Sequence, residues 1–159
     1  MYTEITIPAF CDRVLGFSVP ESTTVWAMSR QGLHKIELGL KTTVETNPTH
    51  AEDYEIFDTE SNILDYKGKR HLMLGENGGE PILQSTVRHT LRRGPLGTVS
   101  ARGESWETFD VLGADGKVVQ QLRFPDTSGD WCYATFSEDG RYVVIGVPHR
   151  LYAYCRIDR

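Results

Sequence analysis

The fold is decided by one stretch, Trp131-Cys-Tyr-Ala-Thr-Phe-Ser-Glu-Asp-Gly-Arg-Tyr-Val-Val-Ile-Gly-Val147. Two apolar, β-prone runs flank Glu138-Asp-Gly140, and Asp-Gly supplies the positive backbone dihedrals of a tight hairpin. A further run, residues 151–157, follows a short link. We therefore predict a three-stranded antiparallel meander here.

The same pattern recurs elsewhere in the chain. Residues 108–112 and 117–124 bracket Gly113-Ala-Asp-Gly116, which repeats the turn chemistry. Residues 14–29 predict strand, turn and strand, and their apolar positions align with the C-terminal unit when 119 is added to each number. Any two alternating meanders can align in this way, so an internal repeat and a chance match both stay open.

The middle of the chain predicts short strands with little helix. Candidate strands are residues 54–58, 63–66, 71–74 and 81–87, separated by turn residues. The only helical turn expected is at residues 48–52, where Thr49 and Glu52 have capping-box spacing.

Length and composition favour one soluble domain, residues 1–159, of the all-β class. The chain has 159 residues, 39% hydrophobic and 25% charged, which is enough to bury a core without disulfides or a metal. Three cysteines without CxxC spacing predict reduced thiols. Neither a signal peptide nor eighteen consecutive apolar residues can be found, so we expect a cytoplasmic protein that does not bind membranes.

Residues 135–146 resemble the inner hairpin of β-propeller repeats of the WD and YVTN type, in which an aromatic residue and Ser precede an Asp-Gly turn and an apolar strand. The Gly-His opener and the Trp-Asp dipeptide of WD repeats are missing. The resemblance implies four-stranded blades of roughly 40–45 residues, so that the chain holds at most about four. The predicted fold is thus a small or partial propeller-like stack of antiparallel meanders, with a β-sandwich as the alternative.

Charge is distributed unevenly along the chain. The formal net charge is −5, which disfavours nucleic-acid binding. Residues 42–66 contain seven acids and neither Lys nor Arg, with aromatic residues between the acids. This stretch is either a solvated surface or a face that attracts a basic protein. The candidate contact residues here are Glu52, Asp53, Tyr54, Glu55, Phe57, Asp58 and Glu60.

A basic stretch follows the acidic one. Arg88, Arg92, Arg93 and Arg102 could grip a phosphate or carboxylate, or could balance the acids from an exposed loop. Trp106 lies in a polar context and is expected at the surface as a candidate contact, whereas Trp26 lies on an apolar run and is expected in the core.

Catalytic motifs are missing from the sequence. His50 with Asp53 is the nearest candidate for a base and its orienting acid, but its spacing matches no metal motif, and we expect neither metal nor cofactor. The sequence therefore favours a non-enzymatic protein-binding module, in its most specific form an acidic inhibitor or immunity-type protein. Two alternatives stay open: a small hydrolase or ligand-binding enzyme that uses the His/Asp pair or the arginines, and a subunit that self-associates.

Overall fold

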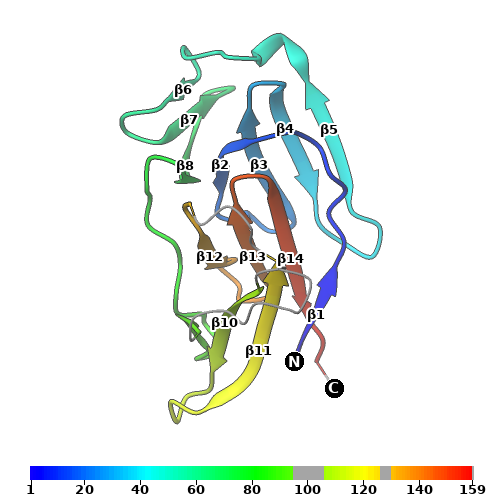
Figure 1. The fold of residues 1–159 in the computed structure, drawn as a ribbon, viewed down its shortest axis with the longest axis vertical. Helices are drawn as coiled ribbons and strands as arrows, with labels where there is room; N and C mark the ends of the chain where they lie inside the picture. Colours follow the sequence, from blue (N-terminus) through cyan, green and yellow to red (C-terminus); the bar gives the residue numbers. More distant parts are fainter. Residues whose placement is uncertain (95–105, 126–129, 159) are drawn as a thin grey trace.

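The chain forms three antiparallel β-sheets (Figure 1). The computed structural model describes residues 1–94, 106–125 and 130–158. Strand makes up 55% of the structure, and one of the sheets is strongly curled, which confirms the predicted all-β class. The described residues contain no helix long and apolar enough to cross a membrane.

The sheets have four, three and seven strands. The four-stranded sheet has the order β1 (Tyr2–Ile5), β14 (Arg150–Arg156), β13 (Tyr142–Val147), β12 (Tyr133–Phe136). The three-stranded sheet has the order β11 (Val118–Pro125), β10 (Trp106–Leu112), β9 (Thr90–Arg93). The seven-stranded, curled sheet has the order β5 (Thr43–Asn47), β4 (Gly32–Glu37), β3 (Thr24–Ser29), β2 (Val14–Ser18), β8 (Lys69–Gly75), β7 (Ile63–Tyr66), β6 (Phe57–Asp58).

The hairpin between β12 and β13 forms as predicted. The Gly140 amide donates to the Ser137 carbonyl at 2.9 Å, and Gly140 has a φ of +70°, which a Cβ would disfavour. Asp139 accepts from the Ser137 hydroxyl at 2.6 Å and from the Arg141 amide at 3.0 Å. The turn at 113–116 between β10 and β11 repeats this geometry, with Gly116 at a φ of +77°. Local side-chain chemistry therefore fixes both turns.

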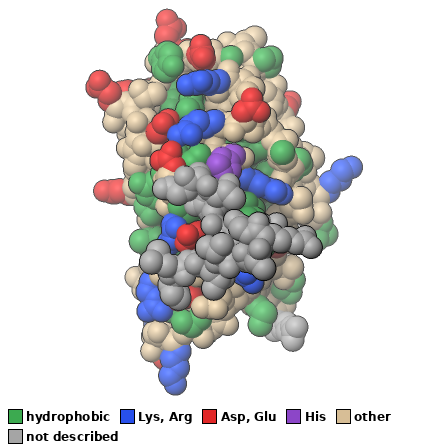
Figure 2. All heavy atoms as spheres, viewed as in Figure 1, with side chains coloured by type: hydrophobic (Ala, Val, Ile, Leu, Met, Phe, Trp, Pro, Cys, Tyr) green, Lys and Arg blue, Asp and Glu red, His purple; other side chains and the backbone are tan. Residues whose placement is uncertain are grey.

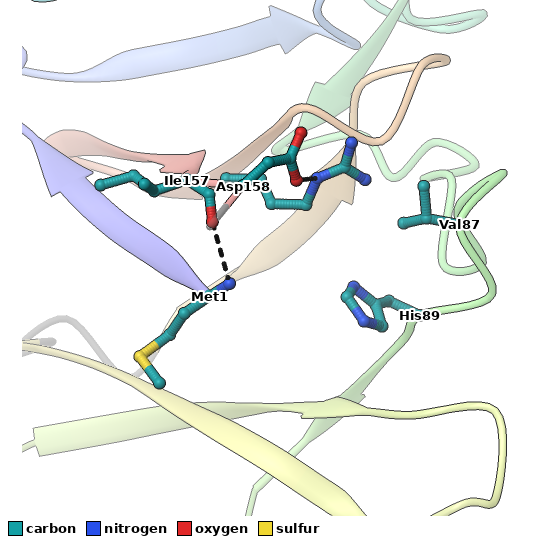
Figure 3. A pocket seen from close by; sticks show the side chains of 6 residues that line it. Met1, Val87, His89, Ile157 and Asp158 are labelled. Carbon is teal, nitrogen blue, oxygen red and sulfur yellow. Dashed lines mark hydrogen bonds and ion pairs between the residues drawn. The ribbon is translucent and has the colours of Figure 1, made fainter.

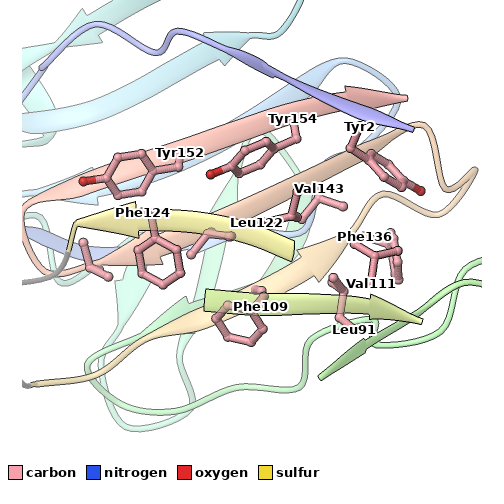
Figure 4. Packing of buried hydrophobic residues seen from close by; sticks show 13 residues of the cluster. Tyr2, Leu91, Phe109, Val111, Leu122, Phe124, Phe136, Val143, Tyr152 and Tyr154 are labelled. Atoms are coloured by element: carbon pink, nitrogen blue, oxygen red, sulfur yellow. The ribbon is translucent and has the colours of Figure 1, made fainter. Parts of the chain in front are cut away.

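The four-stranded sheet is the central layer, because both of its faces are covered. On β13, Val143 and Ile145 pack toward the three-stranded sheet, whereas Val144 packs toward the curled sheet. Figure 4 shows the first of these layers, with Tyr152 and Tyr154 of β14 over the apolar side chains of the three-stranded sheet. Burial of both faces explains why the sequence of β13 is almost continuously apolar rather than alternating.

At Gly146 of β13 the central layer lies directly against the curled sheet. A Cβ at this position would overlap the ring of Phe17, which projects from β2 and is fully buried. Phe17 also stacks on Trp131, with ring centroids 6.3 Å apart. The two sheets can approach this closely only because residue 146 has no side chain.

The three-stranded sheet is joined to the central layer at both of its edges. On one side, the side-chain amide of Gln120 exchanges two hydrogen bonds with the backbone of Tyr2, at 2.8 and 2.6 Å. On the other side, the Ile82 carbonyl accepts from the Phe136 amide of β12, and the Leu83 carbonyl accepts from the Leu91 amide of β9. These bonds satisfy backbone groups that would otherwise form open sheet edges.

The predicted strand at 81–87 is therefore wrong in detail. This segment has only one isolated bridge, between Gln84 and Thr90, and the strand of this region is β9. Its backbone groups bridge two sheets rather than pairing along one neighbour, and Arg88 with a φ of +62° turns the chain before β9 begins. The short helical turn was predicted correctly, as η1 (Pro48–His50), but its cap is Asn47, whose side chain accepts from the Thr49 amide.

A separate apolar cluster fills the concave face of the curled sheet. Its fully or nearly fully buried members are Met28, Leu33, Phe57, Leu64 and Met73. Alternate residues of the same strands face the central layer, so the curled sheet separates two cores.

Replacement of Gly146 by alanine should destabilise the protein by about 1–3 kcal/mol, because the added methyl group must displace the Phe17 ring in a packed core. Urea unfolding followed by tryptophan fluorescence measures this change. Gly39→Ala is the matched control, since a Cβ at position 39 meets nothing within 4 Å. Equal stability of the two variants would contradict the close approach of the sheets.

His34 of β4 is a neutral histidine held in the interior. Its Nε2 lies 2.6 Å from the Ser29 hydroxyl and its Nδ1 lies 2.8 Å from the Thr46 hydroxyl, and its ring packs on Phe10. Because the side chain is fully buried, desolvation lowers its pKa from 6.5 to about 4.

Stability should consequently fall as the pH drops from 6.5 toward 4. The unfolded chain takes up a proton at residue 34 near pH 6.5, whereas the folded chain does so only near pH 4. The loss due to His34 is roughly 2 kcal/mol at pH 5. Urea unfolding at pH 7 and pH 5 should show a smaller loss for His34→Gln than for the wild type, while the exposed His149→Gln control keeps the full loss. An unchanged loss in His34→Gln would refute this assignment.

Candidate functional site

Carboxylates gather at the end of the curled sheet that carries β6 and β7. We call this group the acidic end, and its exposed members are Glu52, Glu55, Asp58, Glu60 and Asp65. They lie on the loop after η1, at the end of β6, on the turn between β6 and β7, and on β7 itself. Figure 2 shows acidic side chains projecting from this upper end of the molecule. None of the five forms a salt bridge with any residue that the structure describes.

Turns hold the acidic end in shape. Asp58 accepts from the backbone amides of Glu60 and Ser61, and these hydrogen bonds, with the Ser61 hydroxyl as the largest cause, keep its pKa below the ordinary value. Glu52 and Asn62 adopt positive φ values of 53° and 57°. The turn thus has a defined backbone, and its hydrogen bonds favour the ionised form of Asp58.

His50 and Asp53 are brought together, as the sequence suggested. The Asp53 carboxylate lies 2.9 Å from Nδ1 of His50, and this hydrogen bond lowers the pKa of Asp53. The other ring contact described for His50 is edge-on with Tyr66, at 5.3 Å between centroids. The arrangement orients an imidazole, which is one part of a general-base site. Among the described residues, no group of three His, Cys, Asp or Glu could hold a metal ion.

The two aromatic candidates of the acidic stretch differ in exposure to solvent. Tyr54 is 67% exposed beside the carboxylates and can contact a partner. Phe57 is buried to 1% exposure, so its prediction as a surface contact is wrong. Its side chain faces the inside of the curled sheet, where it packs with Leu64 and Met73.

A groove that the sequence did not predict lies near the acidic end. Trp26 of β3 and Tyr66 of β7 form its base, with ring centroids 5.5 Å apart. Two adjoining hollows, of about 390 and 400 Å³, share these two rings and Lys35 and Lys67. Trp26, expected in the core, is therefore only half-buried and lines the groove. Trp26 lies on the opposite face of β3 from the buried Val25 and Ala27. How far its side chain is exposed there depends on the curl of the sheet.

Two of the lysines that line the groove lie close to carboxylates. Lys35 lies 3.8 Å from Glu37 and over the Trp26 ring. Lys69 lies 2.5 Å from Glu21, which also accepts from the buried His71. The groove therefore has mixed charge, in contrast to the unpaired carboxylates of the acidic end.

The arginine stretch is largely engaged within the molecule. Arg92 pairs with the buried Asp110 at 3.1 Å, and Arg93 pairs with Glu107 at 3.1 Å. These are cross-strand pairs between β9 and β10, which the register of the two strands brings together. Arg88 is exposed on the turn before β9, and the predicted Arg102 lies outside the described residues.

Trp106, expected at the surface, is half-buried. The guanidinium of Arg123 on β11 stacks over its ring at 4.5 Å, so the partner of Trp106 is internal. This pair could not be predicted from local sequence, because it depends on the pairing of β10 with β11.

Comparison with known proteins adds no identification. No protein-family model, curated protein or solved structure matches the chain. The resemblance of residues 135–146 to propeller repeats consequently stays a prediction.

Proposed function

We propose that the protein is a non-enzymatic binding module that engages a basic partner protein through its acidic end. The observation that carries this proposal is the contrast in charge pairing. Five exposed carboxylates at the acidic end lack cationic partners among the described residues, whereas the arginines of β9 and two lysines of the groove pair with carboxylates nearby.

Electrostatics give such a surface a clear physical use. Unpaired like charges on one surface repel one another, and a basic partner relieves this repulsion while its approach is accelerated by the field. Exposed Tyr54 adds an aromatic contact with few rotamers to immobilise. The most specific form of the proposal is an inhibitor or immunity-type protein that covers a basic surface of its partner.

The setting that fits this proposal is a reducing, cytoplasmic one. Cys11, Cys132 and Cys155 are half-buried thiols rather than disulfides. Burial raises the pKa of Cys11 to about 11, so its thiol stays protonated and unreactive. Propeller-type hairpin units would supply a stable scaffold for the presenting loops.

Neutralisation of Glu52, Glu55 and Glu60 by Gln should weaken binding to a basic partner by about tenfold at low salt, since exposed ion pairs contribute up to about 1 kcal/mol each. The partner is captured from lysate by the wild-type chain, and its affinity for each variant is measured by calorimetry at two salt concentrations.

Glu4, Glu80 and Glu138 provide the matched control, because their replacement by Gln removes the same charge from exposed positions elsewhere. The proposal requires that this control binds like the wild type and that salt weakens wild-type binding. An acidic partner, or an affinity that does not change with salt concentration, would rule the proposal out. So would an equal loss of affinity in both triple variants.

A further inference from the structure

A cavity of about 510 Å³ opens where the end of β14, the start of β1 and the approach to β9 meet. It lies at the opposite end of the chain's fold from the acidic end (Figures 1 and 3). The residues that line it are Met1, Val87, His89, Arg156, Ile157 and Asp158.

Two polar atoms in the lining of this cavity are buried without a hydrogen-bond partner. They are Nδ1 of His89 and Nη1 of Arg156, and the described residues contain only three other such side-chain atoms. A buried N–H that bonds to nothing costs about 1–3 kcal/mol, and more when it carries charge. Two such groups beside one cavity leave hydrogen-bonding capacity that the protein itself does not use.

Both side chains are held in place by the fold rather than by each other. The His89 amide donates to the Ser85 hydroxyl at 3.2 Å, and the His89 ring packs edge-on against Tyr2. The Nε of Arg156 donates to the mostly exposed Asp158 at 2.9 Å, which leaves Nη1 free of that carboxylate. In Figure 3 Val87 and His89 lie on one side of the cavity, and Met1 and Ile157 lie on the other.

The electrostatics of the cavity favour an anion. Burial and the charge of Arg156 both lower the pKa of His89, so that at neutral pH its ring is uncharged and can donate one N–H. Asp158 is the opposing carboxylate, but its side chain is 80% exposed and screened by water. A planar guanidinium matches the two oxygens of a carboxylate.

The rim of the cavity is apolar and exposed. Met1 is 74% exposed, Val87 39% and Ile157 52%. A molecule whose acidic group reaches Arg156 would therefore lay a hydrocarbon part against these three side chains. We propose that this cavity binds a small carboxylate that carries a short apolar tail, with Arg156 and His89 as donors to its oxygens.

Titration of the full chain with hexanoate, followed by calorimetry and by NMR of the histidine rings, tests this proposal. We expect saturable binding that is tighter than that of acetate, and a rise in the pKa of His89 on binding. Hexanol and hexylammonium lack the anion and should not bind there. Inorganic phosphate, if it binds as well as hexanoate, would overturn the assignment of an apolar tail.

Arg156→Gln should weaken hexanoate binding by about tenfold or more, because a hydrogen bond to a charged group is lost. His89→Gln should weaken it by a smaller factor. The exposed Arg70→Gln is the matched control and should bind normally. If Arg156→Gln fails to fold, Arg156→Lys and His89→Gln carry the test. Wild-type affinity in the folded His89 and Arg156 variants, or no saturable binding at tens of millimolar, would overturn the proposal.

The proposal is independent of the function proposed for the acidic end. The variant with Gln at positions 52, 55 and 60 should bind hexanoate like the wild type, because these residues lie outside the cavity. The two proposals can thus fail separately.

Discussion

The structure depends on the close contact between a glycine of the central layer and an aromatic ring of the curled sheet. Gly146 lies under Phe17, and no side chain fits between them. This contact sets the distance between the two sheets and, with it, the core that Val144 and Ala153 share with Val25 and Ala27. Protein interiors are packed as densely as organic crystals, so one added methyl group at this point must shift the packing across the interface.

Because both faces of the central layer are covered by apolar packing, the polar contacts between it and the three-stranded sheet lie at the sheet edges. The side chain of Gln120 and the backbone of Ile82 complete the hydrogen bonding at the edges of the three-stranded sheet. The acidic end lies beyond the cores, on turns that no other sheet covers. The arginines of β9 are paired because β10 places acids close to them, with Asp110 directly opposite Arg92.

Local features of the fold could be predicted from the sequence, and features that depend on register or curvature could not. Ser137, Asp139 and Gly140 interact only with near neighbours, so their turn follows from sequence chemistry. Whether Phe57 or Tyr54 faces solvent depends on the direction in which the sheet curls, which no local pattern encodes.

The candidate sites divide in the same way. The acidic end could be found because its residues are neighbours in sequence. The groove of Trp26 and Tyr66 and the cavity of His89 and Arg156 could not, because strands distant in sequence bring each pair together. The apolar run around Trp26 predicted a core position, whereas the groove that it lines depends on the register of four strands.

The pairing of β1 with β14 has a consequence for biosynthesis. Tyr2 lies opposite Arg156, so β1 cannot pair with β14 until all the residues between them have been synthesised. Closing so long a loop is entropically costly and slow, so the central layer is completed late in folding. The curled sheet, whose strands all precede residue 76, can form earlier and offer a template on which the late strands condense.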